Sequence, residues 1–184
     1  MPNWCNNTIT ISHSDPAMMD RVFNSLSEGK FLNEFFPCPA ELHQHSAPQR
    51  DEVLAQQFLE KHGASDWYQW QVAHWGTKWD VGGDSTERVN ANTVTASFDS
   101  AWSPPTQAYE QLIDLGFEIQ AYYYEPGMCF AGVWTGDANG FNDDCREYST
   151  ESAQSVREAV GEELDDYWGI SDSLADWDED DQDQ

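Results

Sequence analysis

The amino-acid sequence predicts an α+β sandwich, in which helices pack on an antiparallel sheet. Hydrophobic residues make up 39% of the 184 residues and aromatic residues 14%, which indicates a packed interior rather than a disordered chain. Short stretches alternate apolar and polar residues with period two, as strands do, and stretches of helical periodicity lie between them. Proline and glycine separate these stretches at positions where helices begin or end.

The first half of the chain predicts a strand, a helix and a helical insertion. Residues 4–12 alternate as a strand with one buried face, and residues 15–27 follow an Asp-Pro start with apolar side chains at helical spacing. Residues 48–62 and the aromatic segment that ends at Trp75 are also predicted to be helical. We therefore expect a helical insertion over about residues 30–75.

The second half predicts more strands around one helix. The expected elements are strands at 77–81, 93–102 and 117–124, a helix between Thr106 and Gly116, and two hairpin strands, 128–135 and from Phe141 onward. Apart from the insertion, the order strand-helix-strand-strand-helix-strand is that of a ferredoxin-like sandwich, extended by two strands. The term describes topology and implies no iron–sulfur cluster.

The end of the chain differs in composition from the rest. Residues 151–167 predict an acidic helix, and the residues after Gly169 are mostly Asp and Glu. We therefore assign residues 1–147 to the ferredoxin-like domain and residues 148–184 to an acidic helix with a partly disordered tail.

The net charge of −26 limits the classes of partner. The chain has 34 acidic and 8 basic residues, and residues 141–184 alone contain 16 of the acidic and 2 of the basic ones. Such a field repels nucleic acid and anionic membranes and favours basic protein surfaces. Three interpretations remain open: solubility, adaptation to a salty cytoplasm, or mimicry of a nucleic-acid backbone.

Several patterns are missing from the sequence. No apolar run approaches the roughly 18 residues that span a bilayer, and the first residues lack the pattern of a secretory signal, so we expect a cytoplasmic protein. The cysteines at positions 5, 38, 129 and 145 show no paired spacing and are expected to be free thiols. No pattern calls for a cofactor.

Four segments together resemble a known family. They are Met1-Pro2-Asn3-Trp4-Cys5-Asn6-Asn7, Trp75-Gly76-Thr77-Lys78-Trp79-Asp80, Ala101-Trp102-Ser103-Pro104-Pro105 and Tyr124-Glu125-Pro126-Gly127-Met128-Cys129-Phe130-Ala131-Gly132. In this order they resemble small phage- and plasmid-borne proteins with a ferredoxin-like domain, the Api-like or YubB-like proteins. The resemblance covers about residues 1–140 and implies the fold and an origin in a mobile genetic element. It implies no catalytic residues.

The tryptophans of these segments have two interpretations. Trp4, Trp75, Trp79 and Trp102 could stack nucleobases, but the binders that do so surround their rings with Lys and Arg. We therefore predict that these four form a structural aromatic core. Lys78, between two indoles, predicts a cation–π contact.

Two histidines are weak candidates for a metal site. His43 and His45 would share one face if they lay on a strand, and could then chelate one ion. No second pair has ligand spacing, so we expect surface histidines and no metal. A metal-dependent hydrolase that uses these histidines with nearby acids is kept as an alternative function.

The acidic end holds the candidate partner-binding residues. They are Glu158, Glu162, Glu163, Asp165, Asp166, Asp176 and Asp178. We expect a non-enzymatic phage or plasmid accessory protein that binds a host protein with a basic surface, such as a defence or nucleic-acid-binding protein. In the remaining alternative the acidity reflects only a high-salt habitat.

Overall fold

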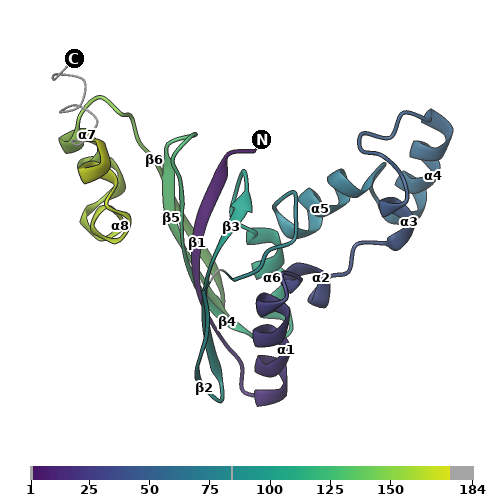
Figure 1. Cartoon of the computed structure of the whole chain (residues 1–184), viewed down its shortest axis with the longest axis horizontal. Coiled ribbons are helices and arrows are strands. Elements are labelled where there is room, and N and C mark those ends of the chain that lie inside the picture. Colours follow the sequence, from purple (N-terminus) through teal and green to yellow (C-terminus); the bar gives the residue numbers. More distant parts are fainter. Residues whose placement is uncertain (1, 84, 175–184) are drawn as a thin grey trace.

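The structure, a computed structural model, describes residues 2–83 and 85–174 of the chain. Over these residues the chain forms an antiparallel sheet of six strands with helices on both of its faces (Figure 1). The strands are β1 (Trp4–Ser12), β2 (Ser85–Asn90), β3 (Thr93–Ala101), β4 (Glu118–Glu125), β5 (Phe130–Asp137) and β6 (Gly140–Glu147). The helices are α1 (Pro16–Ser27), α2 (Phe31–Phe35), α3 (Ala40–His43), α4 (Glu52–His62), α5 (Trp67–Trp75), α6 (Thr106–Asp114), α7 (Ala153–Val160) and α8 (Glu162–Trp168).

The strand order identifies the fold. The sheet runs β2-β3-β1-β4-β5-β6, and every neighbouring pair is antiparallel. Strands β1 to β4 alternate with α1 and α6 in the order that defines a ferredoxin-like sandwich. The predicted α+β fold is therefore confirmed, and the β5-β6 hairpin extends the sheet beyond β4.

One strand lies elsewhere than the sequence predicts. Residues 77–81, expected to form a strand, are irregular, and the strand that follows the insertion is Ser85–Asn90. The carboxylate of Asp80 accepts the backbone N–H groups of Leu32 and Asn33 at 2.7 and 3.1 Å, which fastens the irregular segment to α2. Strand β2 is an edge strand with a single apolar residue, so hydrophobic alternation could not reveal it.

The main core lies between one face of the sheet and the helices α1 and α6. Alternate residues of β1 are buried there, whereas Thr8 and Thr10 point to the opposite face and are more accessible. Buried residues of the main core are Cys5, Ile9 and Ile11 of β1, Met19, Val22 and Leu26 of α1, Phe98 of β3, Ala108, Tyr109 and Leu112 of α6, and Trp134 of β5.

The inserted residues form a helical arm, which we define as helices α3, α4 and α5. Figure 1 shows the arm extending away from the sheet on the side opposite α7 and α8. Asp51 and Asp66 cap the beginnings of α4 and α5, and Gly63 and Gly76 end these helices with φ of 75° and 86°, a conformation that glycine adopts readily. Buried Trp75 connects α5 to the main core.

Helices α7 and α8 pack on the other face of the sheet. Their buried residues Val156, Val160 and Leu164, with Ile170, form a second cluster against residues of β4 and β5. The acidic helix expected at the end of the chain is thus two short helices that form a layer of the sandwich. As elsewhere in the described chain, neither helix is long and apolar enough to cross a membrane.

Candidate functional site

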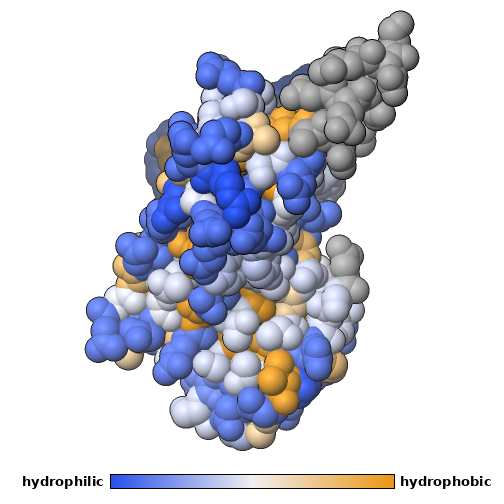
Figure 2. Space-filling view, turned by 90° about the vertical axis from the view of Figure 1, so that its left-hand side faces the viewer, coloured by the Kyte–Doolittle hydropathy of each residue, from blue (hydrophilic) through white to orange (hydrophobic). Residues whose placement is uncertain are grey.

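The acidic helices α7 and α8 are positioned by their apolar faces. Val156 and Val160 of α7 are fully buried, and Tyr122 and Val133 of the sheet pack against this cluster. Gly161 lies between the two helices with φ of 83°, which allows the chain to turn there. The polar sides of both helices therefore face solvent, and Figure 2, which looks onto this side of the molecule, shows a mostly hydrophilic surface.

Arg157 gathers three of the predicted partner-binding carboxylates. Its Nη1 lies 3.0 Å from Oδ2 of Asp165, and its Nη2 lies 2.9 Å from Oδ1 of Asp166 and 3.3 Å from Oε1 of Glu162. Asp166 and the other two carboxylates raise the pKa of Arg157. These acidic groups are therefore held together by one guanidinium.

Asp165 is not available to a partner. Its side chain is 2% exposed, and its carboxylate accepts the backbone N–H and the hydroxyl of Ser171 at 2.8 and 2.6 Å. The prediction that Asp165 binds a partner is wrong, because its oxygens are already used inside the fold. Asp165 instead connects α8 to the residues that follow it.

Strand β6 adds to the same acidic surface. Nη1 of Arg146 donates to the carbonyl of Val160 at 2.7 Å, which fastens β6 to the end of α7. The same arginine lies 2.6 Å from Asp144 and holds the pKa of that carboxyl below its usual value. A groove of about 210 Å³ brings Asp144, Arg146 and Glu163 together between α8 and the sheet.

We call Asp144, Glu158, Glu162, Glu163 and Asp166 the acidic face. All five are exposed, and two of them bond to neutral side chains. Tyr122 donates to Glu163 at 2.8 Å, a bond that raises the pKa of the tyrosine, and Gln154 donates to Glu158 at 2.6 Å. The other two predicted residues, Asp176 and Asp178, lie outside the described residues.

Of the four tryptophans predicted to form an aromatic core, one is buried and three are exposed. Trp75 is 1% exposed, and its Nε1 donates to the carbonyl of Phe36 at 2.9 Å. Trp4, Trp79 and Trp102 are 45%, 37% and 46% exposed, so the predicted core role is wrong for these three. Trp79 and Trp102 lie in irregular segments, where no strand alternation directs side chains inward.

Lys78 makes the predicted cation–π contact, but one of its two rings differs from the ring that the sequence indicates. Its Nζ lies 4.5 Å from the ring centroid of Trp79 and 5.7 Å from that of Tyr68. Tyr68, at the start of α5, thus takes the place expected for Trp75, which is turned into the core.

The two histidines considered as metal ligands contact different rings. His43 stacks on Trp67 with centroids 6.0 Å apart, and His45 packs 5.3 Å from the ring of Phe58. His43 ends helix α3 rather than lying on a strand, so the two residues do not share a strand face. Across residues 2–83 and 85–174, no group of three or more His, Cys, Asp or Glu side chains is arranged to hold a metal ion.

The four cysteines are free. Burial raises the pKa of Cys5 to about 12 and that of Cys38 to about 11. Both thiols are therefore protonated at neutral pH, and a protonated thiol is a poor nucleophile.

Sequence reasoning missed the two arginines that organise the acidic face. Residues 141–184 contain 16 acidic residues and only two basic ones, which are Arg146 and Arg157. That scarcity was a usable signal, because a base that is surrounded by acids tends to pair with several of them. Tyr122 gave no such signal, since its partner Glu163 is 41 residues away in the sequence.

Comparisons with known proteins identify one distant structural likeness. A scan against protein-family models finds no match, and a search of curated proteins finds none at a significant level. Among solved structures, the chain is similar to protein api92 from Yersinia pseudotuberculosis, described with the family model DUF1281. The identity is 12% and the TM-score 0.45, over 81% of this chain and 99% of that one. The name api92 agrees with the Api-like resemblance of the sequence motifs.

Proposed function

We propose that this protein is a non-enzymatic accessory protein that binds a partner protein through the acidic face, and that the partner presents a basic surface. The observation that carries the proposal is the anchoring of the acidic helices. Arg146 fastens β6 to α7, and Arg157 holds carboxylates of α8. The acidic groups are therefore displayed by a packed layer of the fold.

Carboxylates held in this way favour binding for two reasons. Residues 151–174 contain seven acidic residues and one basic residue, a net charge of −6, which attracts a basic surface and speeds the encounter. Side chains that are already held in place also lose less freedom on binding, where each immobilised side chain costs about 0.5–1.5 kcal/mol.

We further propose that the partner is a host protein with a nucleic-acid-binding surface, such as a defence nuclease, which the acidic face blocks. DNA offers one negative charge per ~1.7 Å of duplex, and a dense acidic surface can compete for the same basic residues. The resemblance of the motifs to phage- and plasmid-borne proteins supports this choice of partner. On the same resemblance we propose the cytoplasm of an infected or plasmid-bearing cell as the location.

The experiment compares three immobilised full-length proteins in a nuclease-treated bacterial lysate. They are the wild type, the face variant Glu158→Gln/Glu162→Gln/Asp166→Asn, and the control variant Glu52→Gln/Glu60→Gln/Asp114→Asn. The control removes the same number of charges from exposed positions on α4 and α6. Circular dichroism establishes that all three are folded, and mass spectrometry identifies the retained proteins.

We expect the wild type and the control variant to retain a basic nucleic-acid-binding protein that the face variant does not retain. Added duplex DNA should release that protein, because both would occupy the same basic surface. Equal retention by all three proteins would contradict the proposal. Equal loss from both variants would show that only the total charge matters.

A further inference from the structure

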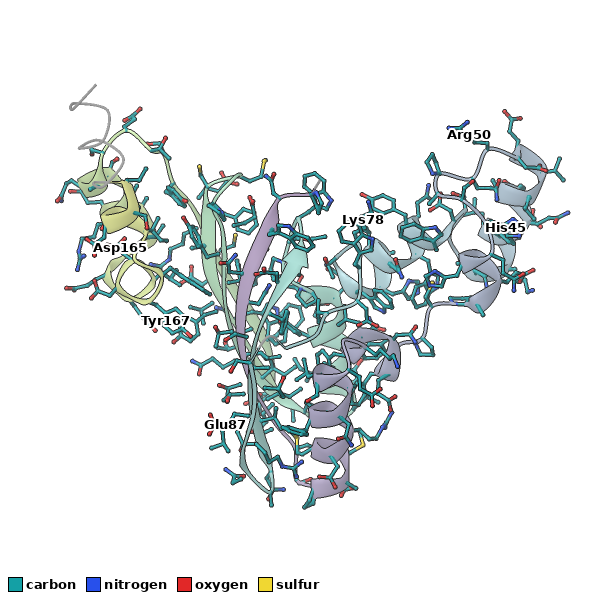
Figure 3. All side chains as sticks on the ribbon, viewed as in Figure 1. His45, Arg50, Lys78, Glu87, Asp165 and Tyr167 are labelled. Atoms are coloured by element: carbon teal, nitrogen blue, oxygen red, sulfur yellow. The ribbon has the colours of Figure 1, made fainter. Side chains whose placement is uncertain are left out.

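A hollow beside Lys78 lies outside the acidic face. Its volume is about 390 Å³, and its walls include Pro48 of the loop before α4, Trp67 and Tyr68 at the start of α5, and Lys78. Ligand pockets begin at about 300 Å³, so the hollow has room for one small molecule. Figure 3 shows Lys78 at the end of the helical arm that lies nearest the sheet.

The hollow is next to aromatic rings that the fold leaves at the surface. Tyr68 contributes to its wall, and the ammonium of Lys78 bridges from Tyr68 to the ring of Trp79. The ring of Trp79 lies 5.8 Å from that of Trp4 at an angle of 41°. All three rings are exposed, so each retains ring surface on which a planar group can stack.

The charge of Lys78 is not compensated within the described chain. Six of the eight basic residues form ion pairs with carboxylates: Arg21, Lys30, Lys61, Arg88, Arg146 and Arg157. Lys78 forms none with a described residue, although acidic residues outnumber basic ones 34 to 8. Asp66, the carboxylate in the wall, is buried and accepts backbone N–H groups of Gln49 and Gln69.

We propose that this hollow binds a planar heteroaromatic anion of the nucleoside monophosphate class. The base stacks on the exposed ring of Tyr68 in the wall of the hollow, and the phosphate pairs with Lys78, whose compact ammonium suits a phosphate oxygen. The volume fits one such molecule. A long nucleic-acid strand is disfavoured, because the net charge of −26 repels a polyanion while a single phosphate adds little repulsion.

The test is isothermal titration calorimetry of the full chain with four ribonucleoside monophosphates, with adenosine, and with ribose 5-phosphate. We expect at least one monophosphate to bind about tenfold tighter than either fragment, because only it uses both the rings and the ammonium. Lys78→Gln should reduce the affinity for adenosine monophosphate to that for adenosine. Tyr68→Leu should weaken the binding of both adenosine compounds, because it removes the exposed ring in the wall.

Lys30→Gln is the matched control. Lys30 is exposed and pairs with Glu28 on the α1 side of the molecule, so its loss removes one positive charge and should leave the affinity unchanged. Absence of binding by all four monophosphates at millimolar concentration would overturn the proposal, as would an unchanged affinity in folded Lys78→Gln. A short single-stranded oligonucleotide that binds tighter than any monophosphate would also overturn it.

Discussion

Arg157 and Asp165 form a partly buried ion pair between the two acidic helices. Nη1 of Arg157 on α7 lies 3.0 Å from Oδ2 of Asp165 on α8, and the Asp165 side chain is 2% exposed. The next residue, Asp166, contacts the same guanidinium from the surface with a side chain that is 60% exposed. Two adjacent aspartates therefore have different roles, one inside the fold and one on the acidic face.

Replacement of each aspartate tests this difference. Asp165→Ala should lower the free energy of unfolding by about 2–4 kcal/mol, because the buried N–H and hydroxyl of Ser171 lose their acceptor. Asp166→Ala should change it by about 0.5 kcal/mol or less, as is usual for an exposed position. Urea denaturation followed by circular dichroism measures both. Similar losses in the two variants would contradict the assignment of Asp165 to the interior.

Two tryptophans of one motif should differ in the same way. Trp75→Ala should destabilise the protein by about 3–5 kcal/mol, because it empties a buried site of the main core. Trp79→Ala should cost about 1 kcal/mol, since the exposed ring loses mainly its contacts with Trp4 and Lys78. Thermal unfolding of both variants measures the two effects, and a larger loss for Trp79 would show that its ring is part of the core.

Removal of the acidic helices should lower the stability of the fold more than removal of a solvated tail would. A chain that ends at residue 150 keeps the main core but uncovers Tyr122, Tyr124, Ala131 and Val133 on the other face of the sheet. We expect it to fold with lower stability and to bind a hydrophobic dye such as ANS. A chain that ends at residue 174 retains the second cluster and should not bind the dye. Dye binding by neither shortened chain would show that the second cluster does not cover the sheet.

Salt should stabilise the protein without any partner. With a net charge of −26 the folded chain repels itself, and the Debye length falls from about 30 Å at 0.01 M salt to about 3 Å at 1 M. The midpoint of urea unfolding should therefore rise with sodium chloride concentration. A midpoint that does not depend on salt would remove the high-salt interpretation and indicate that acidic charges are well separated or compensated.

The stability should also respond to the ionisation of Asp80. Burial raises the pKa of Asp80, and the N–H groups of Leu32, Asn33 and Val81 only partly oppose this effect. A raised pKa favours the neutral form in the folded state. The stability that Asp80 contributes is then fully present below its pKa in the unfolded chain, about 3.8. It is lost as the pH rises through the pKa of Asp80 in the folded protein.

The measurement is the difference in free energy of unfolding between the wild type and Asp80→Asn. From neutral pH down to about pH 4, this difference should shift in favour of the wild type, because the variant has no titrating group at this position. The subtraction removes the general effect of acid on the other carboxylates. A shift in favour of the variant would mean that the hydrogen bonds outweigh burial.

Most of the fold could be predicted from the sequence, because the spacing of apolar residues indicates which face of a strand or helix is buried. Strand β1 alternates clearly, since one of its faces is buried and the other is polar. Strand β2 at the sheet edge carries one apolar residue and was missed. The aromatic Trp75–Asp80 segment was predicted to enter a strand, but Asp80 bonds to the N–H groups of α2, 47 and 48 residues away. A local pattern cannot report a bond of that separation.

The fold class and the concentration of acidic charge at one end of the chain can both be read from the amino-acid sequence alone. Both follow from properties that are read along the chain: the period of apolar residues and the count of ionisable ones. Which side chains are accessible to a partner follows instead from the packing of the whole chain. It buried Asp165 beside exposed Asp166, and it left Trp79 at the surface while Trp75 entered the core. Exposure depends on which parts of the chain pack against a residue. Of two adjacent residues of the same type, one can therefore be buried and the other exposed.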